Sequence, residues 1–142
     1  KGTKLTQELI SRNQAFKFIP LENLSNSEVR ELFQRAKIYI DFGNHPGKDR
    51  MPREAAMANC CIITGRKGSA FNDVDIPIPQ IYKYEDNEVL NGDKFHELIS
   101  NIFTDFEKNI SNFVPYKNKI RLEREVFKQQ VTDLFSDLLY EK

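Results

Sequence analysis

The sequence predicts an α/β fold built around a small parallel sheet, and three adjoining stretches support this. Residues 38–42 and 60–64 are nearly continuous in apolar and β-branched character, which is typical of strands covered on both faces. Residues 52–58 fit a short helix between them, because Pro52 is tolerated in a first helical turn. Strand, helix and strand in this order form the βαβ unit of a parallel sheet. We therefore expect a Rossmann-like α/β/α sandwich with helices on both faces and two C-terminal helices.

The first third of the chain reads as helix, strand, helix. Residues 3–13 carry leucine and isoleucine at helical spacing, which indicates a surface helix with one apolar face. Residues 16–19 form a short β-prone run that Pro20 stops, because proline has no amide hydrogen for a ladder. Ser25 and Glu28 match a capping box, so a second helix is expected from there to the first central strand.

The second half of the chain supplies one more strand and the terminal helices. Residues 75–79 alternate isoleucine with proline, which suits an extended edge segment, and residues 81–84 fit a short strand. A long amphipathic helix is predicted over 93–112, and Pro115 separates it from a final helix that continues to about residue 138. Two such helices cover a small sheet and leave one apolar stripe free for a partner domain.

Length, charge and cysteine usage exclude several classes of function. The chain has 142 residues, about one domain, with 21 acidic and 21 basic residues, so no overall field favours nucleic acid or an anionic membrane. The adjacent Cys60 and Cys61 lie in an apolar run, which favours buried thiols in a reducing compartment over a disulfide or a zinc site. No signal peptide is visible and no stretch approaches the roughly 20 apolar residues of a membrane span. We expect a cytoplasmic domain with no transmembrane segment.

Most of the unusual chemistry lies in two loops, each at the carboxyl end of a predicted strand. The first, residues 43–54, holds three cations, one imidazole and two carboxylates around two glycines. Cations at the start of a helix oppose its dipole unless an anion lies between them, and phosphate fits Arg50 and Arg53 as forks and Lys48 as a point charge. The simpler interpretation is a solvated loop with surface charge.

The second loop, residues 65–70, adds two cations and small residues that let backbone amides approach a ligand. Ligands of open parallel sheets bind in the crevice outside the carboxyl ends of the strands, so we expect the two loops to converge on one site. The candidate substrate-binding residues are Gly43, His45, Gly47, Lys48, Asp49, Arg50, Arg53, Glu54, Gly68, Ser69 and Ala70. We expect no metal ion and no cofactor.

Two of these residues have alternative interpretations. Glu54 is either a favourable helix N-terminal charge or an acceptor for a pair of vicinal sugar hydroxyls. His45 is a candidate proton carrier, and so a candidate catalytic residue, or simply an exposed loop residue beside Pro46.

Five pieces follow one another in the chain: the strand Ala36–Asp41, a polar loop, the helix Arg53–Ala58, the strand Asn59–Thr64 and the pair Gly68-Ser69. This order resembles the C-terminal, donor-binding domain of GT-B type glycosyltransferases, and the resemblance covers about a third of the chain. It implies a UDP- or GDP-sugar ligand, with Glu54 at the ribose, the second loop near the diphosphate and the first loop beside the sugar. The chain departs from the family at Pro46, where the family has a glutamate, which places it in a divergent branch such as one serving bacterial capsule or surface polysaccharide.

The resemblance also implies a larger parent protein. We expect residues 1–142 to be a single nucleotide-sugar-binding domain, the truncated C-terminal half of a two-domain enzyme that lies in the cytoplasm or at the inner face of the membrane. Its N-terminal acceptor-binding domain would be the partner, and the isolated domain would be inactive. The parent would transfer a sugar to a glycan or lipid-linked acceptor, with lysine, arginine and helix N-termini stabilising the leaving diphosphate. The alternatives are a phosphate-ligand domain of a sugar-phosphate or nucleotide-sugar isomerase or epimerase, and a non-catalytic interaction module.

Overall fold

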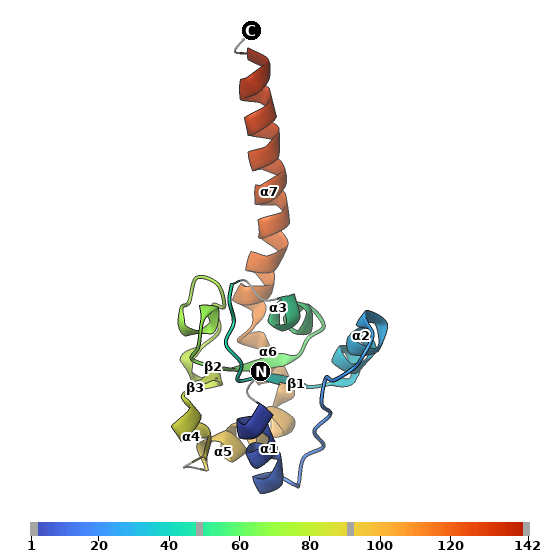
Figure 1. Ribbon diagram of the computed structural model, residues 1–142, viewed down its shortest axis with the longest axis vertical. Coiled ribbons are helices and arrows are strands. Elements are labelled where there is room, and N and C mark those ends of the chain that lie inside the picture. The colour runs from blue at the N-terminus through green and yellow to red at the C-terminus, as the bar shows by residue number, and fades with distance from the viewer. Residues whose placement is uncertain (1–2, 48–49, 91–92, 141–142) are drawn as a thin grey trace.

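The structure, a computed structural model, describes residues 3–47, 50–90 and 93–140. Figure 1 shows a body made of short strands and helices, from which one long C-terminal helix projects. The fold is mixed α/β with a small parallel sheet, as the sequence predicts.

Within the described residues the sheet has three strands, β1 (Ile38–Asp41), β2 (Cys61–Gly65) and β3 (Lys83–Tyr84). Their order is β1-β2-β3, and both neighbouring pairs are parallel. The central strand β2 is buried along its whole length. Of the residues of β1, only Tyr39 is buried, because this strand lies at an edge of the sheet. Cover on both faces is therefore confirmed for the second predicted strand and only partial for the first, whose Ile38 and Ile40 are half-buried against the core.

The crossover between β1 and β2 is the helix α3 (Arg50–Met57). Pro52 lies in its first turn, where the missing amide hydrogen has no partner to lose, as predicted. Asn59 follows the helix with a φ of 66°, a left-handed conformation that asparagine tolerates and that ends helices. The predicted βαβ unit is thus present at this place in the chain.

Helices lie on both sides of the strands. Figure 1 shows α1 (Thr3–Arg12), α4 (Asp86–Leu90) and α5 (Lys94–Thr104) below the sheet and α3 above it. The helix α4 contacts both α1 and α5, and α2 (Asn26–Arg35) contacts α3. The capping box of α2 is confirmed, because the Ser25 hydroxyl accepts from the Glu28 amide and the Glu28 carboxylate accepts from the Ser25 amide.

The two cysteines are buried at the start of the central strand, as predicted. The Cys60 thiol donates to the carbonyl oxygen of Phe33 at 3.3 Å, which ties the end of α2 to the sheet. Burial raises the pKa of Cys60 to about 11 and that of Cys61 to about 12. Both thiols are therefore protonated at neutral pH and serve as small core residues.

Two predicted extended segments are not strands. Residues 16–19 pair with no strand in the part of the chain that the structure describes. Instead Phe16 stacks on Phe103 with ring centroids 5.4 Å apart, so this aromatic side chain covers α5. The isoleucines of 75–79 are buried, but the segment runs through turns and does not join the sheet. The predicted strand over 81–84 is shorter than expected, because a single 3₁₀ turn, η2 (Gln80–Tyr82), occupies its first half.

The predicted helix over 93–112 is two helices. The first, α5, ends at Thr104, and α6 (Phe106–Ser111) begins after Asp105, whose φ of −131° and ψ of 66° break the helix. The Asp105 carboxylate then accepts from the Lys108 amide, because aspartate is a favourable N-cap residue. Sequence periodicity missed this break because the apolar spacing continues across it.

The last helix, α7 (Val114–Tyr140), starts earlier than predicted, and Pro115 lies in its first turn. Between residues 93 and 140, all of which the structure describes, there are therefore three helices where two were expected. No helix within the described residues combines the length and apolar character that crossing a bilayer requires.

Candidate functional site

The candidate site lies where β1 and β2 end. The first loop leaves β1 after Asp41 and reaches α3 at Arg50, and the second follows Gly65 at the end of β2. Two predicted site residues, Lys48 and Asp49, lie outside the described residues. The remaining predicted residues of both loops are described.

The two loops are joined by backbone contacts. His45 and Gly68 form an isolated parallel bridge, and the Ser69 amide donates to the His45 carbonyl oxygen at 2.8 Å. The Ser69 hydroxyl donates to the carbonyl oxygen of Gly47, which adds a second link. The expected convergence of the two loops is confirmed, since the first loop continues the parallel pairing of the sheet beyond its strand.

Gly68 is the one position of the bridge where the backbone requires glycine. Its φ is +57°, and a Cβ atom added there would lie 2.0 Å from the His45 carbonyl oxygen and 2.6 Å from the Asn44 side-chain oxygen. Gly47 is different, because a Cβ there meets nothing within 4 Å. The close approach of the two loops therefore depends on the missing side chain of Gly68.

Several amides of the second loop already have hydrogen-bond partners within the chain. The Ser69 amide bonds to His45, and the Ala70 amide donates to the Lys67 carbonyl oxygen at 3.2 Å. Ala70 is fully buried, and residues 69–71 make a single 3₁₀ turn, η1. The predicted approach of the Gly68 and Ser69 amides to a phosphate does not hold for Ser69, because the His45 carbonyl oxygen occupies its amide.

The end of β1 carries a carboxylate that sequence reasoning missed as a site residue. Asp41 accepts from the Tyr39 hydroxyl at 3.0 Å and from the Gly43 amide at 2.7 Å. Its second oxygen, Oδ2, also lies 3.8 Å from Nε2 of His45. An aspartate directly after an apolar strand was the available signal, because such positions lie at the ligand-binding edge of a parallel sheet.

His45 is buried, at 1% exposed, so the interpretation as an exposed loop residue is wrong. Its side chain lies beside Asp41 and its carbonyl oxygen holds the second loop. The residue therefore links the β1 end to the β2 end from inside the fold. Burial at this level does not suit a proton carrier that must reach a substrate.

A polar row crosses the sheet next to the loops. Asp41 is opposite Thr64 in the register, and Thr64 is opposite Lys83, so the three residues are cross-strand neighbours. The Lys83 side chain is fully buried, and its Nζ donates to the Asp73 carboxylate at 2.7 Å and to the carbonyl oxygen of Asn72 at 3.1 Å. The hydrogen bond and the charge of Lys83 lower the pKa of Asp73.

The two arginines at α3 point to different helices. Arg50 lies 3.1 Å from the Glu54 carboxylate and donates to the Asn26 side chain of α2 at 2.9 Å. Arg53 contacts Glu123 of α7 at 2.6 Å. Their side chains are 61% and 22% exposed, so Arg50 is free to turn towards a ligand and Arg53 is committed to the helix packing. The pair does not converge on one anion in this conformation.

The cations of the second loop are also engaged. Arg66 donates to the Gln80 side chain at 2.7 Å and to the Lys83 carbonyl oxygen at 3.2 Å. Lys67 contacts the Asp86 carboxylate at the start of α4. These bonds fasten the second loop to the segment around β3, so the loop is shaped by internal contacts.

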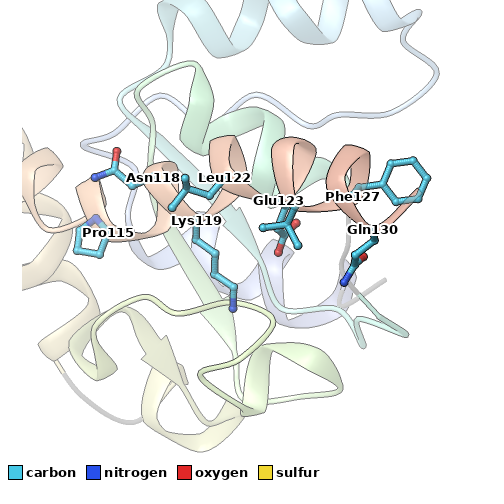
Figure 2. A pocket seen from close by; sticks show the side chains of 8 residues that line it. Pro115, Asn118, Lys119, Leu122, Glu123, Phe127 and Gln130 are labelled. Carbon is cyan, nitrogen blue, oxygen red and sulfur yellow. The ribbon is translucent and has the colours of Figure 1, made fainter. Parts of the chain in front are cut away.

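Two hollows on the surface lie away from the predicted residues. One, of about 670 Å³, runs along α7, and its lining includes Lys119, Leu122 and Val126 (Figure 2). The other, of about 570 Å³, is lined by residues of α1, α4 and α5 and the turns between them. The hollow along α7 is linked to the candidate site by Glu123, which lines the hollow and also contacts Arg53.

Comparisons with known proteins do not identify a relative. The chain matches no protein-family model, no curated protein and no solved structure. Among the described residues, no group of three or more histidine, cysteine, aspartate or glutamate side chains is placed to hold a metal ion. The fold and the geometry of the two loops are therefore the features of this chain that bear on its function.

Proposed function

We propose that this chain binds a nucleoside diphosphate sugar, as the donor-binding part of a glycosyltransferase. The observation that carries the proposal is the joined edge at the carboxyl ends of β1 and β2, where the His45–Gly68 bridge holds two glycine-bearing loops against each other. In open parallel sheets this edge is where nucleotides bind, because helix N-termini and loop backbone surround it.

Arg50 and Glu54 are the residues that would contact the ligand. They form an ion pair at the start of α3, and the side chains are 61% and 35% exposed. A nucleotide offers each of them a better partner, since a phosphate accepts two hydrogen bonds from a guanidinium and a diol donates to a carboxylate. Binding would exchange this exposed ion pair, which contributes little to stability, for two charge-assisted contacts.

The parent reaction would be transfer of the sugar to a glycan or lipid-linked acceptor, such as a precursor of a bacterial surface polysaccharide, in the cytoplasm or at the inner face of the membrane. An acceptor-binding domain would close the crevice from the other side. Within this chain, Arg50 would stabilise the negative charge that develops on the leaving diphosphate. Asp41 and His45 would act as positioning residues, because they hold the two loops in register from inside.

Calorimetric titration with UDP and GDP, together with thermal unfolding, tests the proposal. We expect one of the two diphosphates to raise the melting temperature and Arg50→Ala to weaken its binding about tenfold or more, as expected for a hydrogen bond to a charged group. Glu54→Ala should reduce binding of the diphosphate carrying ribose more than binding of inorganic pyrophosphate. Arg30→Ala, an exposed cation of α2, is the matched control and should bind normally.

Two results would count against donor binding. If neither diphosphate shifts the melting temperature at millimolar concentration, and sugar phosphates do, the isomerase or epimerase alternative is favoured. If the whole panel has no effect, the chain is an interaction module. The second outcome has structural support, because Arg53, Arg66 and Lys67 are already engaged by partners within the chain.

A further inference from the structure

The long helix α7 extends beyond the body that it packs against. Tyr116 is fully buried, and Ile120 is partly buried against the core. Further along, Phe127 is 66% exposed and Leu134 is 60% exposed. Figure 1 shows the helix projecting from the body in this part, with no other described segment beside it.

The exposed residues continue the face that packs on the core. Tyr116, Ile120, Phe127, Val131 and Leu134 follow one another at intervals of four, seven, four and three residues. Such intervals place side chains on one side of a helix, and the last two, of four and three residues, are those of a coiled-coil seam. We define these last three residues, Phe127, Val131 and Leu134, as the α7 stripe. The α7 stripe therefore continues the side of the helix that packs on the core into the part of α7 that projects from the body (Figure 1).

An apolar stripe on a projecting helix is expected to be covered by a binding partner, because it otherwise remains exposed to water. Helices without tertiary contacts gain little stability from propensity alone, and most of their stability in proteins comes from packing of an apolar face. Contiguous apolar side chains on a projecting element mark an interaction surface. Phe127 of the stripe also lines the hollow in Figure 2, whereas Val131 and Leu134 do not. Leu122 lines the hollow too, but its position five residues before Phe127 makes the two side chains project from different sides of the helix.

The charges along the helix indicate which partner fits. Residues 117–128 hold five cations and two carboxylates, and one of those carboxylates, Glu123, is paired with Arg53 of the body. Residues 129–140 hold two aspartates and no cation. An antiparallel neighbour of the same sequence would set the basic half of each helix against the acidic half of the other, whereas a parallel neighbour would align like charges.

We propose that the occupant of the α7 stripe is a second copy of this chain, bound by antiparallel pairing of the two α7 helices. A two-fold axis across the stripe makes the surface self-complementary, because each contact then occurs twice. The proposal does not depend on nucleotide binding, since Arg50 and Glu54 lie outside α7.

Sedimentation equilibrium of the full chain, combined with circular dichroism, tests the pairing. We expect a dimer at roughly 0.1 mM, where an interface with a micromolar dissociation constant is almost fully occupied, and helicity that falls on dilution. Leu134→Asp should give a monomer at the concentration where Leu122→Asp remains a dimer. The two leucines are matched, at 60% and 63% exposed, and differ in the face they occupy.

Salt distinguishes the orientation of the helices. Antiparallel pairing brings opposite charges together, so added salt should weaken the dimer; parallel pairing would be strengthened by the same addition. A chain that stays monomeric at roughly 0.1 mM overturns the proposal and leaves the stripe to another protein surface, such as an acceptor-binding domain. A dimer that Leu134→Asp and Leu122→Asp weaken equally, or that salt strengthens, also overturns it.

Discussion

Replacing Gly68 by alanine tests whether one backbone contact holds the two loops together. A Cβ atom would lie 2.0 Å from the His45 carbonyl oxygen, so the loops must separate or the backbone of residue 68 must change. A non-glycine residue at the φ of +57° and ψ of −136° found there is strained by about 1–3 kcal/mol. Loss of the hydrogen bond from Ser69 to His45 adds about 1 kcal/mol.

We therefore expect Gly68→Ala to lower the free energy of unfolding by about 2–4 kcal/mol, measured by urea denaturation with unchanged m-value. Gly47→Ala is the control from the neighbouring loop, because its Cβ meets nothing within 4 Å, and it should cost no more than about 0.5 kcal/mol. If the two variants differ by less than about 1 kcal/mol, the loops are not held by this contact and the reasoning fails. If Gly68→Ala keeps its full affinity for the diphosphate, the His45–Gly68 bridge is not needed for the proposed nucleotide binding.

Three further predictions concern the scaffold. Ser25→Ala removes the N-cap of α2 and should cost about 1 kcal/mol in urea denaturation; an unchanged midpoint would contradict the cap. Stability should fall as the pH rises from about 9 towards 11–12, because folding holds protons on Cys60 and Cys61 that the unfolded chain releases there; equal unfolding midpoints at pH 8 and near pH 10.5 would refute this. Asp73→Asn should destabilise the fold, since it removes the carboxylate from the buried ammonium of Lys83. Because the pKa of Asp73 is lowered in the fold, the stability that its carboxylate gives the wild type should be lost as the pH falls below 3.8. If Asp73→Asn loses stability with falling pH as steeply as the wild type does, the ion pair between Asp73 and Lys83 does not provide this stability.

The parallel strands and the α2 cap could be predicted from sequence because short-range patterns determine them. A continuous apolar run indicates a central strand whichever residues later cover it, and β2 is buried along its whole length. Ser25 and Glu28 cap α2 through atoms three residues apart, so no distant segment was needed to predict the contact. The convergence of the two loops follows from the same logic, because neighbouring parallel strands end at one edge.

The orientation of the charged side chains could not be predicted in the same way. Arg53 reads as a phosphate ligand in its own loop, but its partner is Glu123, which the tertiary structure brings from α7. His45 reads either as a proton carrier or as an exposed loop residue, and the structure buries it where its carbonyl oxygen accepts from the second loop. Ion pairs between distant residues depend on how helices pack, and local sequence carries no record of that packing.

The sequence by itself determined the central parallel strands and the helix between them, the cap of α2, the buried thiols and the position of two polar loops at strand ends. Only the tertiary structure decided that Gly68 closes against His45, that the helical run over 93–112 breaks at Asp105, and that the expected free apolar stripe includes Phe127, Val131 and Leu134 of α7. The features that the sequence determined and those that it did not differ for one physical reason. Backbone conformation responds to neighbours within a few residues, whereas burial and pairing depend on which distant surfaces fill the same space.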